Sequence, residues 1–196
     1  MKNIILLVLI IFYIPYGTPA LAADTWRTKE NASLLPRYCQ DIVANRWPGN
    51  WRRVLGDVSA HMHHYCSGIY AEMKAKGALG KRERRNWLEK VIGEMRYVSR
   101  DCEPNSCALY PELHTRWGWA LVEQGYAGEA LQHLRMAIEV KPEYILAYVR
   151  LSELYLKIDQ PEEAMKILES GLEVRPGSRT LERRIRELNE NKSSRK

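Results

Sequence analysis

The chain has 196 residues, with 30 Lys and Arg against 24 Asp and Glu, and its net charge is +6 at pH 7. This length suits one compact domain. The basic residues, including a cluster at 81–85 (Lys-Arg-Glu-Arg-Arg), alternate with glutamates. Such alternation indicates solvated helix faces and argues against nucleic-acid binding.

The first 22 residues have the pattern of a secretory signal peptide. Lys2 precedes an apolar run at 4–14, and the segment ends on Ala-Leu-Ala at 20–22. The apolar run is shorter than a helix needs to span a bilayer. The sequence therefore predicts cleavage after Ala22 or Ala23, export to the periplasm or the medium, and no stable membrane insertion of the mature protein.

Residues 23–110 are predicted to form an N-terminal helical region. The polar residues 24–33 are expected to be loosely ordered, and Trp-Pro-Gly-Asn at 47–50 predicts a turn. Apolar residues then recur at helical spacing. Helices are expected at about 33–45, 57–75 and 83–100.

Four cysteines follow the predicted signal peptide: Cys39, Cys66, Cys102 and Cys107. An even number of cysteines in an exported chain predicts disulfide bonds, and four cysteines allow three pairings. Cys102 and Cys107 bracket a turn-rich segment and can close a short loop, which leaves Cys39 to pair with Cys66. Buried free thiols are the alternative, and a zinc site has weak support.

The C-terminal half of the chain repeats itself at a spacing of 34 residues. The matched positions are Ala130 with Ala164, Leu134 with Leu168, Ala137 with Gly171, and Pro142 with Pro176. Together with Trp117, Gly118 and Leu121 upstream, they resemble the tetratricopeptide repeat (TPR), a pair of helices with small and large residues at fixed positions. The resemblance places a first repeat at 111–144, a second at 145–178, and a capping helix and tail at 179–196.

This resemblance implies an all-α fold, a short right-handed TPR-type helical solenoid of about seven helices. It would have an irregular N-terminal hairpin and a C-terminal capping helix. Val91, Met95 and Val98 reproduce the spacing of the second helix of a repeat, and Gly68 takes the place of Gly118. A degenerate hairpin is therefore expected before the two regular repeats, with a longer turn between its helices.

In TPR proteins the first helix of each hairpin lines a concave groove that holds a peptide. The matching positions here are Thr115, Trp119, Val122 and Glu123 from the first repeat and Leu146, Val149, Arg150, Glu153 and Lys157 from the second. Trp119 points away from Trp117, so it is the expected anchor for a partner side chain. The alternatives are that Trp119 packs against a neighbouring helix and that Arg150, Glu153 and Lys157 simply pair with each other.

Residues 61–66 (His-Met-His-His-Tyr-Cys) offer a chemical alternative. His61 and His64 lie one helical turn apart and could ligate copper or zinc, which makes a metal- or haem-handling protein the alternative function. No further ligands at suitable spacing are evident, so no metal site and no cofactor are predicted. The signature motifs of nucleotide-binding and hydrolytic enzymes are missing, and the chain is predicted not to be an enzyme.

A second resemblance covers nearly the whole mature chain. Residues 35–39 (Leu-Pro-Arg-Tyr-Cys) and 63–66 (His-His-Tyr-Cys), followed by two repeats, are similar to a group of exported bacterial TPR proteins of undefined activity. This chain departs from that group in having Ser67 in place of an aromatic residue. The resemblance implies an envelope location and a Cys39–Cys66 bond. We expect an adaptor or assembly factor with a protein or peptide partner in the cell envelope or a secretion system. A purely structural assembly subunit is a further alternative.

Overall fold

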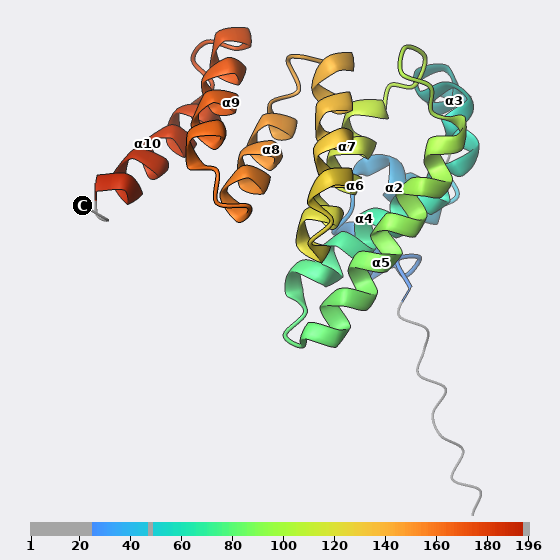
Figure 1. Cartoon of the computed structure of the whole chain (residues 1–196). Coiled ribbons are helices and arrows are strands. Elements are labelled where there is room, and N and C mark those ends of the chain that lie inside the picture. The colour runs from blue at the N-terminus through green and yellow to red at the C-terminus, as the bar shows by residue number, and fades with distance from the viewer. Residues whose placement is uncertain (1–24, 47–48, 194–196) are drawn as a thin grey trace, which may run out of the picture.

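The computed structural model describes residues 25–46 and 49–193 (Figure 1). Within these ranges the chain forms ten α-helices and two short 3-10 helices, with no strand, which confirms the predicted all-α fold. No helix in this part combines the length and apolar character that crossing a membrane requires. The predicted signal peptide at 1–22 lies outside the described residues.

The core of the fold is three antiparallel helical hairpins followed by a single helix. The hairpins are α4 (Met62–Gly77) with α5 (Lys81–Val98), α6 (Tyr110–Gln124) with α7 (Ala127–Val140), and α8 (Ile145–Lys157) with α9 (Pro161–Val174). The last helix, α10 (Arg179–Ser193), packs against α9. Each hairpin contacts the next along the chain, so the molecule is a helical solenoid, as Figure 1 shows.

Small residues bring the two helices of each hairpin close together. A Cβ added at Gly118 of α6 would lie 2.7 Å from Cγ of Leu134 in α7, and one at Gly171 of α9 would lie 2.9 Å from the ring of Tyr148 in α8. Only a residue without a side chain fits such approaches. The spacing of small and large residues in the sequence therefore determines how these helices pack.

The degenerate hairpin is α4 and α5, and it keeps the register of the regular repeats. An added Cβ at Gly68 would meet the side chain of Met95, just as one at Gly118 would meet Leu134. The prediction of a longer turn is wrong in its location. Most of the extra residues extend the helices, because α4 continues nine residues past Gly68 and α5 begins fourteen residues before Met95.

The N-terminal region differs most from the prediction. Residues 24–33 are not loosely ordered over their described part, because α1 (Lys29–Ser33) forms there and the side chain of Trp26 is only 5% exposed. Burial of this indole stabilises the segment, which composition alone does not reveal. The predicted helix at 33–45 is shorter, since α2 (Arg37–Val43) begins after Pro36.

The predicted turn at 47–50 and the helix at 57–75 also need correction. Residues 49–50 already belong to α3 (Gly49–Leu55), while 47–48 lie outside the described residues. A 3-10 helix, η1 (Gly56–His61), then precedes α4, and a second one, η2 (Ser99–Asp101), follows α5. Gly56 takes a φ of 68°, a left-handed conformation that breaks the helical path between α3 and η1.

Candidate functional site

The candidate site is the side of α4, α6 and α8 that carries Glu72, Trp119 and Glu153, which we call the inner face. On it α6 contacts α8, and α8 contacts α10. All nine groove positions expected from the repeats lie on α6 and α8: Thr115, Trp119, Val122, Glu123, Leu146, Val149, Arg150, Glu153 and Lys157. The structure brings them together on neighbouring helices, but it leaves only some of them accessible.

Four of these positions are buried between the helices. Trp119 is 5% exposed, and Thr115, Val122 and Val149 are also buried. The expectation that Trp119 presents its ring to a partner is therefore wrong, and packing against neighbouring helices is what the structure shows. The reason is that an indole at this position fills the space between adjacent first helices, where its apolar area leaves water.

Two cations lie against the ring of Trp119. Nζ of Lys76 in α4 lies 4.8 Å from the ring centroid, and Cζ of Arg150 in α8 lies 5.7 Å from it. Cations at this range are attracted to the electron-rich face of an indole. Trp119 thus connects three consecutive first helices and acts as a structural element of the inner face.

Glu123, at the end of α6, joins three helices through ion pairs. It accepts hydrogen bonds from Arg84 of α5 and from Nζ of Lys157 of α8, the latter at 2.8 Å. Burial alone would raise the pKa of Glu123, but the hydrogen bonds from Lys157 and Arg84 hold it below its ordinary value. Lys157 also donates to the carbonyl of Val122 at 3.2 Å, so it pairs with α6 and not with Glu153.

A second set of charges connects α8 to α10. Arg150 donates to Glu153 at 2.7 Å, and Arg184 of α10 donates to the other carboxylate oxygen of Glu153 at 3.0 Å. Arg184 also pairs with Glu187 at 3.1 Å. The positive and negative side chains on this part of the inner face therefore balance one another.

A pocket of about 340 Å³ opens where α6 and α8 end. Its walls combine apolar side chains with the Glu123–Lys157 pair, and its lining residues are Val122, Glu123, Gln124, Gly125, Ala127, Leu154, Lys157 and Ile158. Sequence reasoning missed Leu154 and Ile158, because Ile158 follows the last turn of α8 outside the repeat pattern. Ile158 is 41% exposed, so the rest of the protein covers this apolar side chain only in part.

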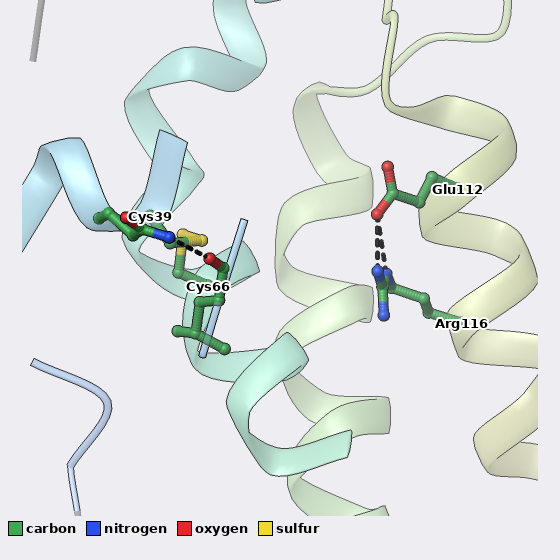
Figure 2. The surroundings of a disulfide bond; sticks show 6 residues. Cys39, Cys66, Glu112 and Arg116 are labelled. Atoms are coloured by element: carbon green, nitrogen blue, oxygen red, sulfur yellow. Dashed lines mark hydrogen bonds and ion pairs between the residues drawn. A yellow bond between two sulfur atoms is a disulfide. The ribbon is translucent and has the colours of Figure 1, made fainter. Parts of the chain in front are cut away.

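The inner face of α4 is covered by the chain's own N-terminal segment. A disulfide joins Cys39 of α2 to Cys66 of α4, and the ring of Tyr38 lies 6.2 Å from that of Tyr65. Figure 2 shows this disulfide together with the Glu112–Arg116 pair of α6. Burial, followed by the carboxylate of Glu112, raises the pKa of Tyr38, so α2 lies within electrostatic range of α6 as well.

A partly buried ion-pair network, which the sequence did not reveal, connects α4 to α6 around the buried carboxylate of Glu72. Arg116 donates to Glu112 at 2.7 Å and pairs with Glu72 of α4, which also accepts from Lys76. Burial would raise the pKa of Glu72, but the charges and hydrogen bonds of Arg116 and Lys76 hold it below its ordinary value. Burial and the Glu112 carboxylate raise the pKa of Tyr144 to about 12. These groups hold α4 to α6, because a buried charge that loses its partner is costly.

The remaining cysteines, Cys102 and Cys107, are also joined by a disulfide, five residues apart in the sequence. Both disulfides therefore have the pairing that was predicted from the short loop between Cys102 and Cys107. The second bond closes the connection between η2 and α6, and both of its cysteines are buried.

The two candidate metal ligands are each paired with a carboxylate. Nε2 of His61 lies 2.8 Å from Asp101, and Nδ1 of His64 lies 2.7 Å from Glu94. The ring of Tyr97 packs against both histidines. In the described part of the chain no group of three or more His, Cys, Asp or Glu side chains could hold a metal ion. The metal-handling alternative has no support from this geometry.

Comparison with known proteins identifies the class. A family model for the tetratricopeptide repeat matches residues 121–181, a span that runs from the end of α6 to the start of α10. This part of the chain therefore matches the tetratricopeptide repeat, in agreement with the spacing of small and large residues. Proteins of this class typically present extended surfaces that bind other proteins.

No curated protein matches the chain. Among solved structures, it is similar to the first TPR domain of Spaghetti (RPAP3), determined bound to the HSP90 peptide SRMEEVD. The two share 18% sequence identity, the match covers 64% of this chain and 95% of that one, and the TM-score is 0.46.

Proposed function

We propose that the protein is a non-enzymatic adaptor of the cell envelope that binds a peptide segment of a protein partner on the inner face of α6, α8 and α10. The observation that carries the proposal is the accessible strip along α8. The strip begins at Leu146, which is 40% exposed, and continues along α8 through Arg150 and Glu153. It ends at the pocket that Lys157 and Ile158 line. In this repeat family the first helices are the ones that bind peptides.

The charge arrangement of the strip indicates the kind of peptide that fits it. Arg150 is paired with Glu153, and Lys157 is paired with Glu123, so the strip has no surplus of positive charge for an acidic terminus. Leu146 and Ile158 offer apolar contacts at its two ends. We expect a peptide with an apolar side chain for the pocket and mixed polar groups along its length.

Export to the periplasm or the medium is part of this proposal. All four cysteines are paired in two disulfides, and structural disulfides persist in oxidising compartments. The leader-like sequence at 1–22 supports the same location. A fractionation of cells that finds the protein reduced and in the cytoplasm would contradict this part of the proposal.

The binding face is tested by photo-crosslinking in native envelope preparations. A crosslinking side chain is placed at Leu146 and, separately, at Ile158, while a matched control carries it at Val174. Val174 is also an exposed aliphatic residue, 46% accessible, but it belongs to α9, the second helix of the hairpin, and not to the first helix that carries the strip. We expect one partner segment to crosslink from both strip positions and not from Val174. The same products from all three positions, or none from the strip, would overturn the assignment.

Loss of capture provides a second readout. Ile158→Glu places a charge at the mouth of the pocket and is expected to abolish capture of that crosslinked partner, whereas Val174→Glu is expected to retain it. Equal helicity of both variants by circular dichroism separates loss of binding from loss of folding. Retained capture by Ile158→Glu would exclude the pocket from the binding site.

A further inference from the structure

The turn between α4 and α5 extends beyond the neighbouring hairpin. We call this turn, together with the last residue of α4 and the first five residues of α5 (residues 77–85), the hairpin tip. The last residue of α6, Gln124, donates to the carbonyl of Arg85 at 3.2 Å, so the residues before Arg85 reach past the end of α6. Figure 1 shows this turn at the lower edge of the helical assembly. The extra length of α4 and α5 is what moves it there.

Leu79 lies at the crest of the hairpin tip with its whole side chain in solvent. Its exposed fraction is 102%, the largest of any exposed large hydrophobic residue in the described chain. Ala78 and Gly80, on either side of it, add no polar group. A leucine in this position makes no packing contribution to the fold, because it touches no neighbouring element.

The net charge of the protein is concentrated in the same place. Residues 74–90 contain seven Lys and Arg and only two Glu, a net charge of +5 in a chain whose total is +6. Within the hairpin tip, Lys81, Arg82 and Arg85 are exposed, and none of the three forms an ion pair within the described residues. Lys76 and Arg84, by contrast, are neutralised by Glu72 and Glu123.

We propose that the hairpin tip binds an anionic bilayer surface, with Leu79 entering the headgroup region while Lys81, Arg82 and Arg85 contact lipid phosphates. Unpaired cations beside one fully exposed apolar side chain complement a negatively charged interface that admits apolar groups. The tip is convex, which suits a broad, deformable surface better than the narrow contact of a bound peptide. The tip adjoins the pocket at the end of α6, because Gln124 lines that pocket and also donates to the carbonyl of Arg85, but Leu79, Lys81 and Arg82 do not line the pocket.

Such binding is reversible and depends on salt. One apolar side chain is a weak anchor, so the basic residues provide most of the attraction, and that attraction is screened within about 10 Å at an ionic strength of about 0.1 M. Each Lys or Arg near an anionic surface changes the partition coefficient by about fivefold. Removal of all three cations is therefore expected to weaken binding by about 100-fold.

The test is co-sedimentation of the protein with lipid vesicles, using the protein as purified from cells. Vesicles of phosphatidylcholine that contain anionic phosphatidylglycerol are compared with vesicles of pure phosphatidylcholine. Three proteins with the same N-terminus are compared. One is unchanged, one carries Lys81→Gln, Arg82→Gln and Arg85→Gln, and the matched control carries Arg175→Gln, Arg179→Gln and Arg186→Gln. The control removes the same charge from exposed positions at the C-terminal end of the solenoid.

We expect the unchanged protein and the control to bind the anionic vesicles alike and the tip variant to lose about 100-fold in partition. Leu79→Ser is expected to dissociate at lower salt than the unchanged protein. An equal loss in tip and control variants would attribute binding to net charge alone and overturn the proposal. So would equal binding to both kinds of vesicle, or no binding by the unchanged protein.

Discussion

Nδ1 of His114 in α6 lies 2.8 Å from Nδ1 of His133 in α7, so one neutral imidazole donates a hydrogen bond to the other. Trp117 stacks on His133 with ring centroids 4.0 Å apart. Burial is the main cause that lowers the pKa of both rings to about 4. The charge of His133 further lowers the pKa of His114, and the charge of Arg96 further lowers the pKa of His133.

This pair predicts a loss of stability in mild acid. Between its ordinary pKa of 6.5 and about 4, each histidine binds protons in the unfolded chain and not in the folded one. Stability therefore rises with pH in this window and is lost as the pH falls through it. We expect the free energy of unfolding to drop by about 2 kcal/mol for His114 between about pH 7 and pH 5, and by less for His133, whose ring is more exposed to solvent.

Urea unfolding at the two pH values measures this effect. The double variant His114→Gln, His133→Gln is the control, since it removes both titrating rings. A pH slope in the control as steep as in the unchanged protein would show that other groups cause it.

The Cys39–Cys66 bond is expected to contribute more stability than the Cys102–Cys107 bond. It closes a loop of 27 residues, whereas the other closes one of 5. Chain-entropy estimates give about 3.5 kcal/mol for the longer loop and about 2 kcal/mol for the shorter one. Urea unfolding of Cys39→Ala, Cys66→Ala and of Cys102→Ala, Cys107→Ala measures both. A larger loss for the short-loop pair would contradict this ranking.

Gly118→Ala is expected to destabilise the protein by about 1–3 kcal/mol, because the new methyl would overlap Leu134. Gly93→Ala is the matched control in the middle of α5. Nothing lies within 4 Å of a Cβ added there, so the change should stabilise the helix by about 0.5–1 kcal/mol. Thermal unfolding distinguishes them, and equal midpoints would refute the close packing of α6 on α7.

Trp119→Ala is expected to reduce the free energy of unfolding by about 3–5 kcal/mol, as for other buried aromatic residues. Leu146→Ala, at an exposed position of the same face, should change it by less than about 0.5 kcal/mol. Chemical denaturation compares the two variants. A Trp119→Ala protein with unchanged stability would show that the indole is not part of the core.

The repeats could be predicted from the sequence because their signal is local. Gly118 and Leu134, or Tyr148 and Gly171, meet within one hairpin, so a pattern of small and large residues specifies both helices and their register. The N-terminal part lacks that redundancy. There α1 and α3 are short, and Trp26 is ordered by burial that no periodic pattern records.

Of the candidate site, the sequence could predict the helices that carry its residues but not which of the residues are accessible. The repeat spacing places the nine groove positions on α6 and α8, where the structure has them. Whether each is accessible depends on how close neighbouring hairpins lie and on where α2 packs. Glu94 reaches His64 across 30 residues, and Arg116 reaches Glu72 across 44. Sequence spacing does not encode contacts of this range, so the carboxylate partners of His64 and Arg116 become visible only in the fold.

The dimensions of α8 would limit the length of peptide that the proposed strip could hold. The strip runs from Leu146 to Ile158, just after the end of α8. A helix rises about 1.5 Å per residue, so these twelve steps span about 18 Å. An extended chain advances about 3.3 Å per residue and covers that distance in about six residues. A peptide bound along the proposed strip would therefore contact it through a short motif, and residues beyond that motif would gain no contact with it.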